Sequence, residues 1–305
     1  MKHIFIVNPA AGGQDNTRKI NEAVKKFASE KGFEYKIYIS EHPKHSEEIV
    51  RKVMSEYKDE TVRFYACGGD GTLNEVAQGV VDYDNAQLTN LPYGTGNDFI
   101  RIFKEDGEFS LENLIDGEVM DVDYIETNKG VSVNITTIGL DARVARGMQK
   151  YKRIFKHNGQ VPYIISIFEN IVTPMSRNLK IEIDGKDVSG DYVVLLVANG
   201  NYYGGGFHPV PDASVTDGKL NVLLIKKLSR FTVARVINAY KNGEYKKYPQ
   251  YIDYFEAEKV SVKQNDKYIM DLNLDGEVIG VSEAEISIGQ KKIHFVVPKK
   301  TAVHE

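Results

Sequence analysis

The 305-residue chain has one cysteine, no apolar run long enough to span a bilayer, and no histidine spacing typical of zinc sites. A single thiol excludes an internal disulfide, and we interpret Cys67 as a small buried hydrophobe in a reducing compartment. The longest apolar run, Val193 to Ala198, has about six residues, whereas a membrane helix needs roughly 18. We therefore expect neither a transmembrane segment nor a dedicated zinc site.

The chain also lacks an excess of basic residues and a signal peptide. Its formal net charge of −4 argues against a nucleic-acid partner. Residues 1–9 enter a strand pattern at once and contain no apolar signal core, so we expect a cytoplasmic protein. With 42% apolar and 27% charged residues, the composition is typical of a globular protein, which at this length has about two domains.

Residues 1–122 alternate strand patterns with helical patterns. The predicted elements are strands at 4–7, 35–39 and 62–67 and helices at 17–31, ended by Gly32, and 46–57. Strands separated by helices indicate a parallel sheet covered by helices, as in a Rossmann-like α/β domain that binds nucleotides. Residues 292–305 are candidates to complete this domain.

Residues 123–291 have a different texture, with β-branched and aromatic runs joined by Gly, Asp and Asn turns. Strands are predicted at 131–137, 179–183, 193–198, 220–225, 259–262, 268–274 and 284–288, with a further one at 293–297 and a helix at 231–242. This pattern predicts an all-β domain, an antiparallel β-sandwich.

The stretch from Gly68 to Glu75 follows the predicted strand 62–67 and has three glycines in four residues. Glycines allow positive φ and let backbone N–H groups approach an anion. Thr72 and Glu75 predict a capping box that opens a helix, and a helix N-terminus attracts phosphate. The pattern therefore predicts a nucleotide site, with a tight turn of purely conformational role as the alternative.

Two further turns follow predicted strands or apolar runs, at Asn8 to Gly13 and at Leu91 to Phe99. Because parallel strands end at the same edge of a sheet, the three turns are expected to lie together where ligands bind. Asp70, in the middle turn, would repel a phosphate unless a cation lay between them. It therefore favours a Mg²⁺-bound nucleotide or a catalytic network.

These turns resemble the motifs of the diacylglycerol kinase and sphingosine kinase-like superfamily of lipid kinases, in its soluble bacterial diacylglycerol kinase branch. The resemblance extends to Gly204 to Phe207, Pro211 to Ala213, Asp217 to Leu220 and Asn273 to Glu277. Each motif is modest, but their order and spacing are specific and span nearly the whole chain.

The resemblance implies a site for ATP. The residues that it places there are Asn8, Pro9, Ala10, Ala11, Gly12, Ser40, Gly68, Gly69, Asp70, Gly71, Thr72, Leu73, Asn74, Glu75 and Thr95. Phosphoryl transfer depends on positioning and charge neutralisation, so we expect Mg²⁺ near Asp70, Asn97 or Asp98. These three residues are candidates for catalytic roles, and which carboxylate touches the metal stays open.

The resemblance also implies that Asp275 accepts the proton of a lipid hydroxyl, assisted by Glu277. The sequence around Asp275 has a second interpretation. Asp-Gly between two apolar strands is the commonest signal for a hairpin, so Asp275 is also predicted as a turn residue.

A second, structural Mg²⁺ is implied by the resemblance at Asp217. Its ligands would be this carboxylate and the carbonyl oxygens of Ser214 and Lys219, with Asp121 linked through water, because hard cations accept oxygen ligands. The alternatives are an ordinary turn at Asp217 and a solvated strand end at Asp121.

The segment from Ala142 to His157 is basic, without acidic residues, and the apolar stretch Tyr163 to Val172 follows it. Its cations are Arg143, Arg146, Lys150, Lys152, Arg153 and Lys156. In a lipid kinase this looks like a docking surface for the inner membrane leaflet, with a solvated basic helix as the alternative. We expect peripheral membrane association, and some relatives suggest a homodimer.

Taken together, the motifs predict a lipid kinase that transfers the γ-phosphoryl group of Mg-ATP to a lipid hydroxyl, converting diacylglycerol to phosphatidic acid. One alternative is an NAD kinase-like phosphotransferase with a soluble acceptor, which shares the Gly-Gly-Asp signature but lacks the stretch from Gly204 to Leu220. Another is a nucleotide-sensing protein without turnover.

Overall fold

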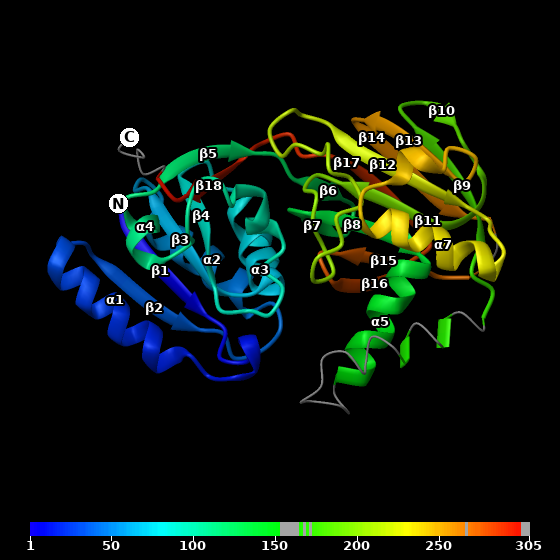
Figure 1. Ribbon diagram of the computed structural model, residues 1–305. Helices are drawn as coiled ribbons and strands as arrows, with labels where there is room; N and C mark the ends of the chain where they lie inside the picture. The colour runs from blue at the N-terminus through cyan, green and yellow to red at the C-terminus, as the bar shows by residue number, and fades with distance from the viewer. Residues whose placement is uncertain (153–164, 167–168, 171–172, 266–267, 300–305) are drawn as a thin grey trace, which may run out of the picture. The chain divides into compact units, whose positions relative to one another are not determined.

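The structure is a computed structural model that describes residues 1–152, 165–166, 169–170, 173–265 and 268–299 (Figure 1). The chain forms two compact units, one from Met1–Asp123 with Gln290–Glu305 and the other from Tyr124–Gly289. Each unit has its own sheet. Among the described residues, no helix is long and apolar enough to cross a membrane.

The first unit contains a six-stranded sheet in the order β2-β1-β3-β4-β18-β5. Its strands are β1 (Lys2–Val7), β2 (Tyr35–Ile39), β3 (Val62–Gly68), β4 (Ala86–Pro92), β5 (Glu118–Val122) and β18 (Ile293–Val297). Neighbouring strands are parallel except β5, which is antiparallel to β18. The predicted parallel α/β sheet is confirmed, and β18 joins it from the far end of the sequence.

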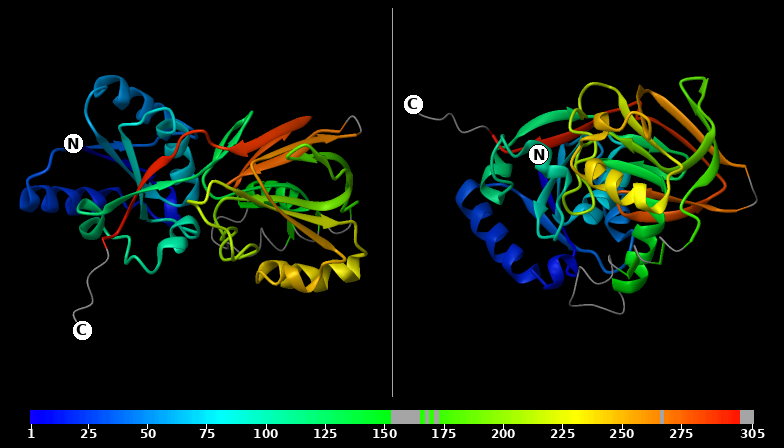
Figure 2. Two further views of the ribbon diagram at one scale, coloured as in Figure 1. Left: turned by 90° about the horizontal axis from the view of Figure 1, so that it is seen from above. Right: turned by 45° about the vertical axis from the view of Figure 1, so that its right-hand side comes forward.

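Helices cover both faces of this sheet. They are α1 (Thr17–Lys31), α2 (His45–Glu56), α3 (Asp70–Val80), α4 (Leu111–Ile115) and the short 3₁₀ turns η1 (Ala11–Gly13) and η2 (Phe99–Phe103). Right-handed crossovers place α1 on one face and α2 and α3 on the other, as the left panel of Figure 2 shows. The helix α1 ends as predicted, at Gly32 with φ of 73°.

The predicted capping box at Thr72 and Glu75 is wrong. The helix α3 begins at Asp70, its N-cap is Gly69, and no side chain caps it. Thr72 therefore lies inside the helix, where its hydroxyl accepts a hydrogen bond from the Asn8 amide at 3.0 Å. The Glu75 carboxylate instead accepts backbone N–H groups at the start of α2.

The second unit is built from antiparallel strands. They are β6 (Ile125–Thr127), β7 (Gly130–Ser132), β8 (Ile135–Gly139), β9 (Arg177–Ile183), β10 (Lys186–Asp187), β11 (Gly190–Ala198), β12 (Leu220–Lys226), β13 (Ile252–Ala257), β14 (Lys259–Gln264), β15 (Met270–Leu274), β16 (Glu277–Val281) and β17 (Glu283–Ile288). Among the described residues, the unit also contains the helices α5 (Leu140–Lys152) and α7 (Arg230–Lys241) and the 3₁₀ turn η3 (Tyr245–Lys247). The predicted antiparallel all-β character is confirmed.

The long strand β11 divides the core of this unit into two clusters. Leu195 and Val197 belong to a cluster formed by strands. Val194, Leu196 and Ala198 belong to a second cluster that includes residues of α7. Alternate residues thus face opposite sides, as expected of a strand with both faces buried.

Two strand predictions need correction. The run 131–137 is not one strand, because it breaks between β7 and β8 where the N–H groups of Val133 and Asn134 turn to the carboxylate of Asp275. The strand predicted from Tyr268 begins at Met270. The sequence analysis also missed β13 and β16.

Cys67 and His3 are among the titratable groups that are buried in the first unit. Cys67 is fully buried, as predicted, and burial raises the pKa of its thiol. His3 is 4% exposed, and its Nδ1 lies 2.8 Å from the hydroxyl of Tyr65. Burial, aided by the positive charge of Arg63, lowers the pKa of His3 from 6.5 to about 4.

We predict that His3 makes the protein less stable as the pH falls from 6.5 to about 4. In this window the unfolded chain binds a proton at His3 and the folded chain does not, so acid favours unfolding. Urea unfolding of the wild type and His3→Gln, at neutral pH and near the lower end of the window, measures this contribution. The variant is expected to lose less unfolding free energy, and equal losses would contradict the prediction.

Candidate functional site

Four segments meet at the carboxyl edge of the sheet in the first unit, one after each of β1, β2, β3 and β4. The N–H group of Asn8 donates to the carbonyl of Cys67 at 3.1 Å, and that of Ser40 donates to Val7 at 2.9 Å. The Asn8 amide also reaches Thr72. The structure thus brings together the segments that the sequence analysis assigned to ATP.

The first turn is shaped by Asn8 and Gly12. The Asn8 side-chain oxygen accepts the N–H of Ala10 at 3.0 Å, which closes an Asx turn. Gly12 has φ of 68°, and a Cβ built on it would lie 2.3 Å from the carbonyl oxygen of Tyr93. A larger residue would push the first turn away from the turn after β4.

The turn after β3 and the turn after β4 contact each other through their backbones. The N–H groups of Tyr93 and Gly94 both donate to the carbonyl of Gly68, at 3.0 and 3.1 Å. A Cβ on Gly94 would lie 2.3 Å from the Cα of Gly69. Glycine is therefore required here by close approach, and the N-terminus of α3 remains uncovered by side chains from these two positions.

Asp70 holds the turn after β4 in place. Its Oδ1 accepts the N–H groups of Asp98 at 2.7 Å and Phe99 at 3.2 Å. A Cβ on Gly96 would lie 2.7 Å from Asp70 Oδ2 and 3.7 Å from Asp98 Oδ2, so both carboxylates converge on this glycine. Asp98 also lies 3.4 Å from Arg101. Two carboxylates that lie near the same glycine are hard oxygen ligands of the kind that Mg²⁺ requires.

Asn97 completes this group of polar side chains. It has φ of 50°, and its amide nitrogen donates to the carbonyl of Gly94 at 2.9 Å. Its Oδ1 is buried and, within the described part of the chain, has no hydrogen-bond partner. Such an oxygen is costly unless something else binds it, so it is a further candidate ligand atom.

Not all of the residues assigned to ATP present their side chains at this edge. Leu73 and Asn74 are buried, and the Asn74 side-chain oxygen accepts the Gln78 amide at 3.0 Å. The Glu75 carboxylate accepts the N–H groups of residues 44 and 46, at 3.0 and 3.4 Å. Those that are exposed or partly exposed at the edge are Asn8, Pro9, Ala10, Ala11, Gly12, Gly69, Asp70, Gly71 and Thr95.

Asp275 belongs to the second unit and is a hairpin residue, as one interpretation of the sequence predicted. Asp275 and Gly276 have φ of 48° and 99° and connect β15 to β16. The Asp275 carboxylate accepts the Ser132 hydroxyl at 2.7 Å and the N–H groups of residues 133–135 at 2.7 to 3.4 Å. Glu277, next in the hairpin, is exposed.

Sequence reasoning missed residues 132–135 as part of this site, because it placed them inside one strand. The only signal was Asn134, a poor strand former within the run of β-branched residues. Four donors fix the orientation of the Asp275 carboxylate and stabilise its charged form.

The residues predicted for a structural Mg²⁺ lie in two places. In the turn before β12, the exposed Asp217 accepts the N–H of Lys219 at 3.0 Å. Asp121 lies on β5 in the first unit, 2.6 Å from the Nδ1 of His294. The turn at Asp217, with Ser214 nearby in sequence, offers hard oxygen donors of the type that Mg²⁺ accepts, and its geometry is also that of an ordinary Asx turn.

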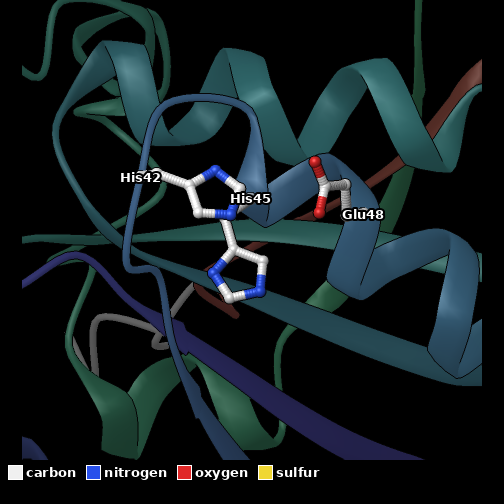
Figure 3. Close-up of side chains that lie close together, drawn as sticks. All are labelled: His42, His45 and Glu48. Carbon is white, nitrogen blue, oxygen red and sulfur yellow. The ribbon is translucent and has the colours of Figure 1, made fainter.

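His42, His45 and Glu48 form a cluster beside the start of α2 whose ligand atoms lie within 4.8 Å of one another (Figure 3). The two imidazole rings are stacked, with centroids 4.6 Å apart. His45 Nδ1 accepts the N–H of Glu41 at 3.0 Å, so the neutral ring carries its proton on Nε2. A metal ligand needs a lone pair there, and this arrangement therefore does not fit a metal centre.

The basic segment is only partly described. Within its described part, Arg146 pairs with Asp271 at 2.7 Å and Lys150 lies 3.6 Å from Glu169. Arg143 donates to the carbonyl of Met175, and its burial lowers its pKa. These cations have protein partners, which weakens the docking hypothesis; Arg153 and Lys156 lie outside the described residues.

Known proteins resemble both halves of the chain. Residues 2–127 match the family described as the diacylglycerol kinase catalytic domain. Residues 134–297 match the family described as the YegS C-terminal NAD kinase beta sandwich-like domain. The fold, the glycine-rich edge and these matches define a two-domain kinase.

Relatives in sequence agree with this class. The chain is 30% identical over 303 residues to a diacylglycerol kinase of Bacillus subtilis (strain 168), which covers 98% of this chain and 97% of that protein. It is 29% identical over 239 residues to a putative lipid kinase of Staphylococcus aureus (strain JH9), covering 77% of this chain and 76% of that protein. The chain belongs to the diacylglycerol kinase family, which implies kinase activity.

Solved structures support the fold. A putative diacylglycerol kinase from Bacillus anthracis str. Sterne superposes with a TM-score of 0.74 at 22% identity, covering 99% of this chain and 98% of that chain. A second, described as one of the diacylglycerol kinases of the same strain, gives 0.69 at 21% identity with the same coverage.

We predict that Gly94→Ala lowers the affinity for Mg-ATP by at least about tenfold, because the new Cβ pushes the turn away from Gly69 and displaces the groups that would face the phosphates. Isothermal titration calorimetry measures the affinity. Gly32→Ala is the matched control, since Gly32 has φ of 73° but nothing within 4 Å of its Cβ. It is expected to lower stability and keep the affinity, and a Gly94→Ala protein with wild-type affinity would contradict the prediction.

Proposed function

We propose that the protein transfers the γ-phosphoryl group of ATP to the hydroxyl of a lipid, with diacylglycerol as acceptor and phosphatidic acid as product. The observation that carries the proposal is the glycine-lined edge of the first unit, where a Cβ on Gly12 or on Gly94 would lie only 2.3 Å from a neighbouring turn. A relative over the whole length, from Bacillus subtilis, is named a diacylglycerol kinase.

The first unit supplies the nucleotide site in this proposal. The helix α3 has 11 residues, and its N-terminus carries a partial positive charge beside Gly69. Backbone N–H groups and this charge favour phosphate oxygens over neutral groups. Asn8 and Ser40 would line the same edge.

Asp70, Asp98 and the Oδ1 of Asn97 are the groups proposed to hold a Mg²⁺ ion. When bound there, Mg²⁺ neutralises charge on the phosphate oxygens. The protein's own contribution is rigidity, since Asp70 is fixed by two N–H groups and Asn97 by the carbonyl of Gly94.

Asp275 is proposed to orient the lipid hydroxyl and accept its proton, with Glu277 assisting. In this step the hydroxyl oxygen forms a bond to the γ-phosphorus while the bond from that phosphorus to the ADP oxygen breaks. The proton moves from the hydroxyl to Asp275, so charge and atoms balance. The donors around the carboxylate support its role in orientation.

The site of action is proposed to be the cytoplasmic face of the membrane, where the acceptor lipid resides. Binding there would be peripheral, with the basic segment as one contact and a homodimer as the assembly that some relatives suggest. A soluble acceptor is the second candidate, because residues 134–297 match a domain described as NAD kinase-like. Phosphate transfer to NAD without lipid vesicles would favour it.

We predict that Asp275→Asn keeps the affinity for Mg-ATP and loses nearly all phosphate transfer, by a factor of at least about 100. The assay measures labelled phosphatidic acid formed from γ-labelled ATP and diacylglycerol in mixed micelles with an anionic lipid. No labelled lipid from the wild type would count against the acceptor, and wild-type turnover in Asp275→Asn would remove Asp275 from the mechanism.

Asp184→Asn provides the matched control for this substitution. Asp184 and Gly185 form a second Asp-Gly hairpin with φ of 46° and 79°, and the Asp184 carboxylate also accepts backbone N–H groups, from residues 258 and 259. The control therefore has the same local strain and lost charge, and it is expected to lower stability without a change in kcat.

We further propose that the turn at Asp217 holds a structural Mg²⁺. The predicted result is that Mg²⁺ raises the melting temperature of the wild type and raises that of Asp217→Ala less, because a bound ion stabilises the folded state. Differential scanning calorimetry with and without Mg²⁺ measures the difference. An identical rise in both proteins, in the absence of nucleotide, would exclude this site.

A further inference from the structure

Asp141 lies where a carboxylate is unexpected. It stands in the first turn of α5 and lines a cavity of about 70 Å³ whose other walls come mainly from apolar residues of α5, β11 and α7. Among these are Leu140, Val144, Val194 and Val236. A carboxylate at such a wall is costly, and an apolar residue of similar size would stabilise the fold more.

Two hydroxyl groups hold this carboxylate. Thr137 donates to Oδ2 at 2.8 Å, and Tyr203 donates to Oδ1 at 3.0 Å. The Tyr203 oxygen also lies 2.7 Å from the hydroxyl of Tyr240. Burial raises the pKa of Asp141, and the hydrogen bonds from Thr137 and Tyr203 act in the opposite direction.

A chain of hydrogen bonds leads from Asp141 to the hairpin of Asp275. Asn273 donates from its amide nitrogen to the Thr137 hydroxyl at 3.2 Å. The Asn273 side-chain oxygen accepts the N–H of Gly276 at 2.9 Å. Thr137 and Asn273 are both buried, so solvent does not replace these bonds easily.

The direction of each bond in this chain follows from Asp141. Because the carboxylate accepts, the Thr137 hydroxyl points its proton to Asp141 and offers a lone pair to the Asn273 nitrogen. The Asn273 amide is thereby oriented with its oxygen toward Gly276. That oxygen fixes the N–H of a turn in which Asp275 holds a positive φ, a conformation unfavourable for a non-glycine residue.

We propose that Asp141 is a positioning residue for Asp275, acting through Thr137 and Asn273. The expected effect on kcat rests on the proposed lipid kinase reaction. The stability of the Asp275–Gly276 turn can be measured without that reaction. Asp141 makes no chemical step of its own. It selects the amide orientation that holds the Asp275–Gly276 turn.

The test uses Asp141→Leu, Thr137→Val and Thr137→Ser in the full chain, with kcat and KM for diacylglycerol in mixed micelles. Asp141→Leu is expected to keep or raise the melting temperature and lower kcat about tenfold, with KM within about twofold of wild type. Thr137→Val is expected to give a similar fall in kcat, and Thr137→Ser, which retains the hydroxyl, to restore it.

The double variant tests whether Asp141 and Thr137 affect kcat through one shared chain of hydrogen bonds or independently of each other. Residues that act in series are non-additive, so Asp141→Leu with Thr137→Val is expected to lose no more than either single variant. Falls in kcat that multiply, or wild-type kcat in Asp141→Leu, would overturn the proposal.

A second measurement does not depend on activity. Hydrogen exchange of the Gly276 amide is expected to accelerate about tenfold in Asp141→Leu and in Thr137→Val, because the local turn opens more often. The Gly185 amide, in the matched hairpin of Asp184, serves as the internal reference and is expected to be unchanged. If the wild type phosphorylates no lipid, the proposed function fails, and this exchange rate still decides the positioning role: unchanged exchange at Gly276 would overturn it.

Discussion

Carboxylates that accept main-chain N–H groups from a distant segment hold the polar loops of both units in shape. Asp70, at the start of α3, accepts those of Asp98 and Phe99. Asp275 accepts those of residues 133–135. Charged acceptors form stronger hydrogen bonds than neutral ones, and loops beyond strand ends have few other partners. Removing either charge would leave several N–H groups without their acceptor, so the geometry around each site depends on it.

This mode of support has a chemical consequence for the proposed base. A carboxylate surrounded by donors keeps one orientation, which favours precise placement of a substrate hydroxyl. For Asp275 the contacts around the carboxylate support a role in orientation. Transfer to a phosphorus with a loose transition state needs little help from a strong base, so orientation is the property that matters most.

Much of the architecture could be predicted from the sequence, because burial on both faces and helical periodicity are local signals. The helix at 17–31 and its end at Gly32 show this. The interruption of the strand at Val133 could not be predicted, since its cause is Asp275, about 140 residues away. The capping box at Thr72 failed for a similar reason: Asn8, from another turn, takes the hydroxyl. Which loops share an edge was predictable, but which side chains within them face inward was not.

The position of β18 links folding of the first unit to the order of synthesis. This strand lies between β4 and β5, and the Val296 carbonyl accepts the hydroxyl of Thr89 in the core. Until residue 297 is made, β4 has an open edge and β5 has no partner in the sheet. At about 5 to 20 residues per second, that interval lasts roughly 9 to 35 seconds after β5 is synthesised. Throughout it, the first unit lacks the strand β18 and leaves an unpaired strand edge open to pairing with other chains.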